Sequence, residues 1–231
     1  MLLKKLNSSW LQRDIKRKGS LSRAFTSVIF SLLILFSTSC QSQHTNQIKM
    51  ESSNNLDTCV IAGGCFWCLD AVYQNMEGIE KVECGYSNGL VKKPTYKDVC
   101  TGRTNCVEVV RLFFDPSKTS YEEILTVFWR IHNPTTLNRQ GNDVGTQYRS
   151  GIYYTSEEQK EIALKSKSAV EESGLWSDPI VTEIVPLKDF SVAEDYHQNY
   201  FENNPNQPYC VYVVGEKVEK FKKLFKEKLK N

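Results

Sequence analysis

The alternation of apolar and polar residues predicts several strands and helices between residue 57 and the lysine-rich end. Runs rich in β-branched and aromatic residues indicate strands at 58–62, 79–86, 107–114, 151–154 and 181–185. Helical composition is seen at 65–76, directly after a Gly63-Gly64 turn. Two capping-box patterns, Ser120 to Glu123 and Thr155 to Glu158, each open a run with helical character, and Gly174 is placed to end the second.

The order of these core elements is β-α-β-β-α-β, with insertions. This order predicts an α+β protein with a ferredoxin-like split β-α-β core, in which the helices lie on one side of the sheet. The segments 87–106, 133–150 and 187–210 contain glycine and asparagine and are expected to be long functional loops. From Lys217 to Lys230 we expect a terminal helix whose apolar side carries Val218, Phe221, Leu224, Phe225 and Leu229.

The segment before residue 57 has a different pattern. Seven basic residues within the first 23 precede an apolar run at 24–36, and small residues then lead directly into Cys40. This resembles a lipoprotein-type signal peptide at 1–39, followed by a flexible tether at 40–56. The apolar run is shorter than the roughly 20 residues that span a bilayer. Lipidation at Cys40 is favoured over simple cleavage nearby, so we expect an exported protein, lipid-anchored on the periplasmic side of the cell envelope.

The net charge changes once this segment is set apart. The whole chain carries a formal charge of +2, but residues 40–231 contain 22 basic and 26 acidic residues, a net charge of −4. A nucleic-acid partner is therefore not expected, because phosphate binding needs a clustered basic face. A mean hydropathy of −0.42 excludes a polytopic membrane protein. Residues 57–231 are expected to form one catalytic domain, monomeric and without cofactor or metal.

The chemistry is expected at Cys65, within the run Gly64-Cys65-Phe66-Trp67-Cys68. A cysteine at the start of a helix lies near free backbone N–H groups, which favour the thiolate and should lower its pKa. The same spacing also permits a zinc half-site, a structural disulfide or a thioredoxin-like pair. The remaining domain cysteines form no second C-x-x-C pair: Cys59, Cys84, Cys100, Cys106 and Cys210.

The motif resembles the signature of the type A peptide methionine sulfoxide reductases, which reduce the S epimer of methionine sulfoxide. Further matches follow in order along the chain: Pro94-Thr95-Tyr96, Val107 to Val110, Gly141 to Ser150, Ala193 to Gln198 and Pro208-Tyr209-Cys210. The resemblance covers residues 58–215. The chain departs from the family at Cys106, where a histidine is usual, which leaves the local packing near Glu108 to be examined.

The resemblance implies a role for each matched residue. Cys65 attacks the sulfoxide sulfur, and Glu108 supplies a proton from a desolvated carboxyl group. Tyr96 and Tyr148 hold the sulfoxide oxygen, and Asp143 anchors the loop of the second tyrosine. Phe66 and Trp67 form a pocket for the methyl group.

The cycle then needs a second thiol. After attack, the sulfenic acid on Cys65 is expected to condense to a disulfide. Cys210, on a C-terminal segment expected to be mobile, is preferred as the resolving residue, while Cys68 competes with it or passes the disulfide onward. A thioredoxin-like dithiol is the expected partner that completes the cycle. His197 is expected to be a satisfied structural residue, and the other domain cysteines to be small buried hydrophobes.

Two other functions fit the same residues. The Cys65 and Cys68 pair could serve a thiol-disulfide oxidoreductase instead. A non-enzymatic envelope lipoprotein could use Phe66 and Trp67 only to dock methionine-like side chains.

Overall fold

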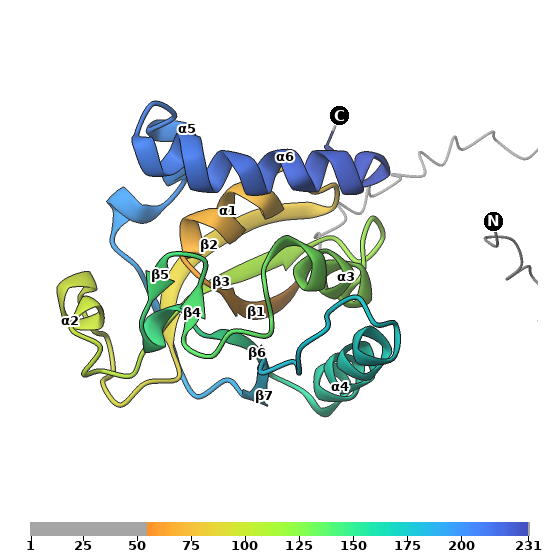
Figure 1. Ribbon diagram of the computed structural model, residues 1–231, viewed down its shortest axis with the longest axis horizontal. Coiled ribbons are helices and arrows are strands. Elements are labelled where there is room, and N and C mark those ends of the chain that lie inside the picture. Colours follow the sequence, from red (N-terminus) through yellow and green to blue (C-terminus); the bar gives the residue numbers. More distant parts are fainter. Residues whose placement is uncertain (1–54, 231) are drawn as a thin grey trace, which may run out of the picture. The chain divides into compact units, whose positions relative to one another are not determined.

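The computed structural model describes residues 55–230 (Figure 1). The predicted signal peptide and Cys40 lie outside the described residues, as does nearly all of the predicted tether. Within residues 55–230, no helix combines the length and the apolar character needed to cross a bilayer.

A six-stranded mixed sheet forms the centre, in the order β7-β6-β1-β3-β2-β8. Its four middle strands are β6 (Ser150–Tyr154), β1 (Asp57–Gly63), β3 (Val107–Phe114) and β2 (Ile79–Ser87), and every neighbouring pair among them is antiparallel. With α1 (Phe66–Gln74) after β1 and α3 (Tyr121–Ile131) after β3, this is the ferredoxin-like arrangement. The α+β fold predicted from the order of elements is therefore confirmed.

Two short strands extend this core at its edges. β7 (Glu183–Pro186) pairs with β6 in parallel, and β8 (Phe190–Val192) pairs with β2 antiparallel. Strand alternation explains why both faces of the sheet are apolar. Cys59 and Ile61 of β1 enter the main core beneath the helices, while Val60 and Ala62 enter a smaller cluster on the opposite face.

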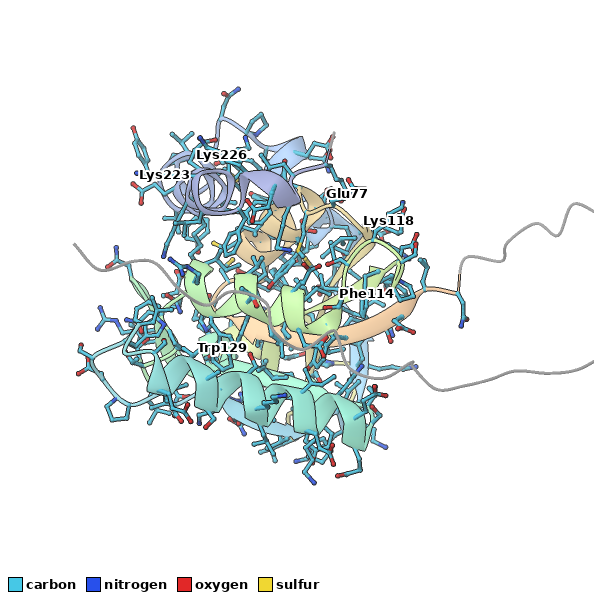
Figure 2. All side chains as sticks on the ribbon, turned by 90° about the vertical axis from the view of Figure 1, so that its right-hand side faces the viewer. Glu77, Phe114, Lys118, Trp129, Lys223 and Lys226 are labelled. Atoms are coloured by element: carbon cyan, nitrogen blue, oxygen red, sulfur yellow. The ribbon has the colours of Figure 1, made fainter. Side chains whose placement is uncertain are left out.

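The helices pack on the larger core. α6 (Gly215–Leu224) packs against α1 (Figure 1). α4 (Glu157–Glu172) packs against α3 through Trp129, whose indole nitrogen donates to Ser166 Oγ at 2.7 Å. Figure 2 shows Trp129 between these two helices.

Local sequence signals predict the helix ends, except that one N-cap lies one residue later than predicted. Ser120 Oγ accepts a hydrogen bond from the backbone of Glu123 at 3.3 Å, as the capping pattern predicts. The second cap is Ser156, which accepts from Gln159 at 3.1 Å, so the predicted box at Thr155 lies one residue too early. Gly174 follows the end of α4 with a positive φ of 66°, as expected for a helix stop.

The segments predicted as loops contain regular structure. Segment 87–106 includes α2 (Tyr96–Cys100), which is capped by Thr95. Segment 133–150 includes the hairpin of β4 (Arg139–Gln140) and β5 (Asp143–Val144) and a 3-10 turn at Thr146–Tyr148. Segment 187–210 includes β8, a 3-10 turn at Asp195–His197 and α5 (Tyr200–Asn203). These elements are too short for hydrophobic periodicity to reveal.

The C-terminal helix is shorter than predicted. It ends at Leu224, and a 3-10 turn at Lys226–Lys228 follows. Val218, Phe221 and Phe225 are buried as expected, but Leu224 is exposed. The helix therefore presents a narrower apolar face than its sequence pattern indicates.

Candidate active site

Cys65 lies at the junction between β1 and α1. Gly64 adopts φ 91°, and a Cβ there would approach the side chain of Gln140 to 2.5 Å, so the turn requires glycine. Cys65 is the N-cap residue of α1 and is only 7% exposed. The sequence prediction of a thiol at a helix start is thus met in position.

The predicted low pKa of Cys65 is wrong for this state of the protein. Burial raises the pKa of the Cys65 thiol well above its usual range, and the neighbouring Cys68 and Glu108 raise it further. The hydrogen bond from Cys65 lowers the pKa of the Cys68 thiol to about 7, and the positive charge of Lys217 acts in the same direction. Desolvation of Cys65 therefore outweighs the effect of the helix N-terminus in the reduced protein.

Glu108 of β3 faces the same helix start. Its carboxyl group is 1% exposed, and Oε2 accepts a hydrogen bond from the backbone N–H of Phe66 at 3.1 Å. Burial raises the pKa of Glu108 to about 8, despite this hydrogen bond. The carboxyl group is therefore largely protonated at pH 7 and can act as an acid. The packing at Cys106 leaves this geometry intact, since that side chain is buried beside Gly89.

Two tyrosines lie near this carboxyl group. Burial raises the pKa of Tyr148, and the nearby Glu108 and Cys65 raise it further. Burial likewise raises the pKa of Tyr96, followed by contributions from Cys100 and Glu108. Both hydroxyl groups therefore remain hydrogen-bond donors at neutral pH.

Glu194 holds Tyr96 in place. Its Oε1 accepts from the backbone N–H of Tyr96 at 2.8 Å, and its Oε2 accepts from the hydroxyl of Tyr86 at 2.9 Å. Glu194 is a residue that the sequence interpretation missed, although it lies within the Ala193 to Gln198 motif. Its carboxylate ties β2 to the start of α2. Glu194 itself lies 98 residues after Tyr96 in the chain.

Aromatic rings surround the nucleophile on its open side. Trp67 stacks on Tyr200 at 3.7 Å between ring centroids, and the edge of Tyr209 packs against it at 5.9 Å. Phe66 is fully buried, so it serves the core as well as the wall of the site. The sequence interpretation assigned no role to Tyr200 or Tyr209, because neither position carries a local signal beyond its motif.

Asp143 of β5 joins the C-terminal segment to the site. Its Oδ2 accepts a hydrogen bond from the hydroxyl of Tyr209 at 2.6 Å. Asp143 was expected to anchor the loop of Tyr148, whereas its recorded partner is a tyrosine of the C-terminal segment that lies next to Cys210. This contact positions the edge of Tyr209 against Trp67.

His197 differs from its predicted structural role. The ring is 1% exposed, and neither ring nitrogen has a hydrogen-bond partner among the described residues. Its ring centroid lies 4.5 Å from that of Tyr96 and 5.0 Å from that of Phe66. Burial lowers the pKa of His197, which keeps the imidazole neutral. It is a packing element of the aromatic wall, but it is not satisfied.

The remaining cysteines separate into different environments. Cys59, Cys84 and Cys106 are buried, as predicted for small hydrophobes, but Cys100 at the end of α2 is exposed. Cys68 lies one turn after Cys65 and is fully buried. Cys210 is also fully buried, in a π-helical turn at Cys210–Val214 that leads into α6. The segment around Cys210 is thus packed in this state, and its mobility stays a prediction.

Comparison with known proteins gives the site its context. The sequence pattern of the family described as "Peptide methionine sulfoxide reductase" matches residues 57–229. The chain belongs to this family.

Relatives and solved structures agree with the assignment. A peptide methionine sulfoxide reductase of Nautilia profundicola is 54% identical over 171 residues, which is 74% of this chain and 97% of the relative. One from Trichodesmium erythraeum is 50% identical over 174 residues, or 75% of this chain and 98% of the relative. Reduced Mxr1 of Saccharomyces cerevisiae matches with a TM-score of 0.62 and 35% identity, covering 68% of this chain and 90% of that structure.

A second solved structure supports the same fold. Methionine sulfoxide reductase A of Corynebacterium diphtheriae matches with a TM-score of 0.59 and 34% identity, covering 67% of this chain and 77% of that structure. As a member of the family, the chain is an oxidoreductase that reduces methionine sulfoxide with thiol groups. The alternative functions, a dedicated thiol-disulfide oxidoreductase and a binding lipoprotein, have no support from these relatives.

Proposed function

We propose that this reductase acts on the S epimer of methionine sulfoxide in proteins and peptides, with Cys65 as the nucleophile and Glu108 as the acid. The observation that carries the proposal is the neutral, buried carboxyl group of Glu108, held at the start of the helix that presents Cys65. A carboxylic acid is kept protonated near pH 7 only where desolvation favours it, and reduction of a sulfoxide needs such a proton.

Each step follows from the positions of these groups. The sulfoxide enters with its methyl group against Phe66 and Trp67, and its oxygen receives hydrogen bonds from Tyr96 and Tyr148. Cys65 Sγ attacks the sulfoxide sulfur while Glu108 protonates the oxygen. The oxygen ends on Cys65 as a sulfenic acid, and methionine leaves in the reduced state. The thiol proton of Cys65 restores the acid form of Glu108, so the step is balanced.

We propose that Cys68, and not the Cys210 preferred from the sequence, is the first resolving thiol, with Cys210 second. In the reduced protein the hydrogen bond from Cys65 lowers the pKa of the Cys68 thiol to about 7, and the positive charge of Lys217, which stays after Cys65 is oxidised, lowers it as well. Cys68 condenses with the sulfenic acid, which forms the Cys65–Cys68 disulfide and releases water. Burial raises the pKa of the Cys210 thiol, as does Cys68, and the turn that holds Cys210 packs against α1. Cys210 can then exchange with this disulfide, and a thioredoxin-like dithiol reduces the product.

The order of the two thiols can be read from the disulfide formed in one turnover. Cys210→Ser is expected to form the Cys65–Cys68 bond at the rate of the wild-type protein. Cys68→Ser is expected to form any disulfide about 10-fold more slowly and to accumulate a sulfenic acid. Mass spectrometry after one equivalent of a peptide S-sulfoxide, with alkylation and a dimedone-type trap, measures both. If Cys210→Ser stops at the sulfenic acid, Cys210 is the first resolving thiol and our order is wrong.

We also propose that the domain is exported and lipid-anchored through Cys40. The basic segment, the apolar run and the small residues before Cys40 support this, as does the polar stretch that follows. A chain of this kind reaches oxidised proteins of the cell envelope, with its net negative domain outside the cytoplasmic membrane.

Labelling with a fatty acid tests the anchor. The full chain, produced in a bacterial host, is expected to incorporate palmitate and to sediment with membranes. Cys40→Ser is expected to lose the label and to leave the membrane fraction, while Cys100→Ser keeps both. Persistence of the label in Cys40→Ser would place the modification elsewhere.

A further inference from the structure

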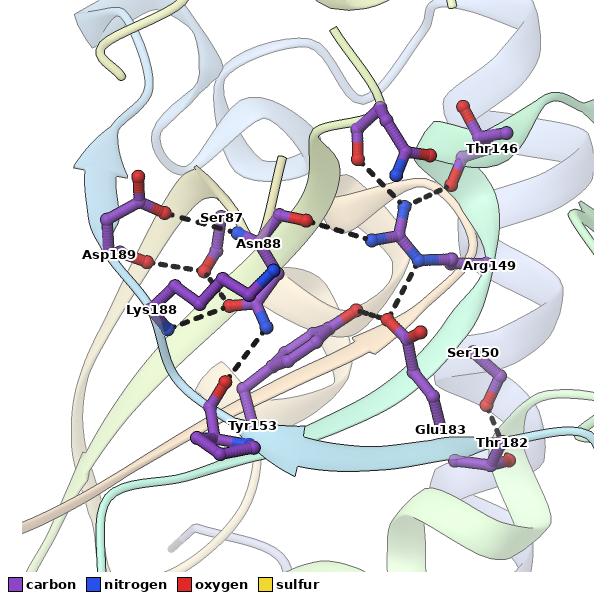
Figure 3. Close-up of polar contacts among 12 residues, drawn as sticks. Ser87, Asn88, Thr146, Arg149, Ser150, Tyr153, Thr182, Glu183, Lys188 and Asp189 are labelled. Carbon is purple, nitrogen blue, oxygen red and sulfur yellow. Dashed lines mark hydrogen bonds and ion pairs between the residues drawn. The ribbon is translucent and has the colours of Figure 1, made fainter. Parts of the chain in front are cut away.

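Arg149 directly follows Tyr148 and makes an unusually complete set of contacts (Figure 3). Its Nε donates to Glu183 Oε1 at 2.8 Å. Its Nη1 donates to the backbone carbonyl groups of Asn105, at 3.1 Å, and Thr146, at 3.0 Å. Its Nη2 donates to the carbonyl of Asn88 at 3.3 Å. Four acceptors from four separate segments thus meet one guanidinium group.

Two of these acceptors close the loop that carries Tyr96. Asn88 directly follows β2, and Asn105 lies two residues before β3, so the Arg149 fork joins the two ends of segment 88–105. Both asparagines have positive φ angles, 51° and 50°, which mark the turns at which the chain leaves and rejoins the sheet. Asn88 is held further by its own Nδ2, which donates to the carbonyl of Pro186 at 2.9 Å.

The third acceptor fixes the turn that carries Tyr148. Thr146 begins the 3-10 turn that ends at Tyr148, and the Arg149 side chain folds back to its carbonyl group. The two loops that present the tyrosine hydroxyl groups therefore share one support. No other described residue is recorded with hydrogen bonds to both loops.

The positive charge of Arg149 is balanced by the carboxylate of Glu183. The Arg149 side chain is 12% exposed, and its partner Glu183 also accepts the hydroxyl of Tyr153 at 2.6 Å. Figure 3 shows Glu183 between the guanidinium group and the Tyr153 ring. A planar guanidinium group has five donors in a fixed arrangement, whereas a lysine ammonium group is a single point of charge. Lysine therefore cannot reproduce the contacts to both loops.

We propose that Arg149 is a positioning residue that sets the distance between the hydroxyl groups of Tyr96 and Tyr148 across the sulfoxide oxygen. The proposal rests on the proposed function and deepens it, since Arg149 touches neither the substrate nor Cys65. The proposal gives Arg149 a function within the Gly141 to Ser150 motif. The sequence interpretation had assigned Arg149 no role.

A double-mutant cycle tests this role. Arg149→Gln is expected to lower kcat for reduction of a peptide S-sulfoxide about 10- to 100-fold, because small displacements of oxygen-binding groups are costly. Arg149→Lys is expected to recover only part of the loss. In a protein that already carries Tyr96→Phe and Tyr148→Phe, Arg149→Gln is expected to change kcat by less than about 3-fold. A purely structural role would leave the loss equal in both backgrounds.

Controls separate this role from stability. Arg111→Gln removes an arginine on β3 that pairs with Glu83 and stacks on Phe190, so it is expected to lower the melting temperature without changing kcat. If Arg149→Gln fails to fold, Arg149→Lys carries the same cycle. An equal loss of kcat in both backgrounds, or no loss at all, overturns the proposal. If the wild-type protein shows no sulfoxide turnover, the proposed function itself fails, which is a distinguishable result.

Discussion

Replacing Cys65 by serine is expected to abolish reduction of methionine sulfoxide, with a loss of at least about 1000-fold in kcat. A serine hydroxyl group matches the thiol in size, but it cannot attack the sulfoxide sulfur or carry the oxygen as a sulfenic acid. The site is 7% exposed and lies at a helix start, so the substitution is expected to leave the fold in place. Such a loss of activity would identify the sulfur atom of Cys65 as the nucleophile.

Loss of a peptide S-sulfoxide, followed chromatographically with dithiothreitol as reductant, measures this expectation. A dimedone-type trap is expected to label the Cys68→Ser, Cys210→Ser protein after one equivalent of substrate, and to leave it unlabelled once Cys65→Ser is added. Cys59→Ala is the matched control, because this thiol is buried near Tyr73 and Tyr121 and not at the site, and it is expected to keep full activity. Turnover that survives in Cys65→Ser would move the nucleophile to another residue.

Replacing Glu108 by glutamine is expected to lower kcat by about 100- to 1000-fold. The amide keeps the shape of the side chain and an oxygen that can accept from the N–H of Phe66, but it has no acidic proton. Because burial raises the pKa of Glu108 to about 8, the acid form is present below that pH. The wild-type rate is therefore expected to fall as the pH rises through about 8, and this fall is expected to be absent in Glu108→Gln.

The same shift predicts an effect on stability with a definite sign. The pKa of Glu108 is about 8 in the folded protein, against 4.5 for an ordinary glutamate, so the folded state prefers the protonated group. As the pH rises from 4.5 to 8, the wild-type protein loses free energy of unfolding that Glu108→Gln retains. The melting temperature of Glu108→Gln minus that of wild type is therefore expected to grow between pH 5 and pH 9.

A partly buried carboxylate in an ion pair provides the control for both measurements. Glu83→Gln removes a charge on the neighbouring strand β2, where the carboxylate pairs with Arg111 away from the site. It is expected to leave kcat and its dependence on high pH unchanged. If Glu108→Gln keeps the wild-type rate and the same fall above pH 8, another group supplies the proton.

The proposed export affects how the oxidised enzyme is reduced again. If the domain is exported as proposed, the dithiol that re-reduces the enzyme has to receive its electrons across the cytoplasmic membrane. Burial of both Cys68 and Cys210 in the reduced state also means that part of α1, or the turn before α6, has to move before an external thiol can reach them. Reduction is thus coupled to a local rearrangement at the C-terminal segment.

The sequence by itself determined the elements and the reactive group. Periodicity placed β1, β2, β3, α3 and α4 within a few residues, because each of them buries one face or both faces in a regular order. The turn at Gly64 and the thiol of Cys65 were also local features, since their geometry depends on adjacent backbone. The matched motifs named Glu108, Tyr96, Tyr148 and Asp143, which lie on the elements that surround Cys65.

The tertiary structure alone decided the partners and the proton positions. Glu108 bonds to the helix start 42 residues earlier, and Asp143 bonds to Tyr209 66 residues later. Such pairings depend on sheet order, and no local pattern contains them. Desolvation reversed the expected pKa of Cys65, because burial at the junction outweighs the favourable field of a short helix. The burial of Cys210 and the contacts of Arg149 with both tyrosine loops also could not be predicted from the sequence, because only packing brings distant segments into contact.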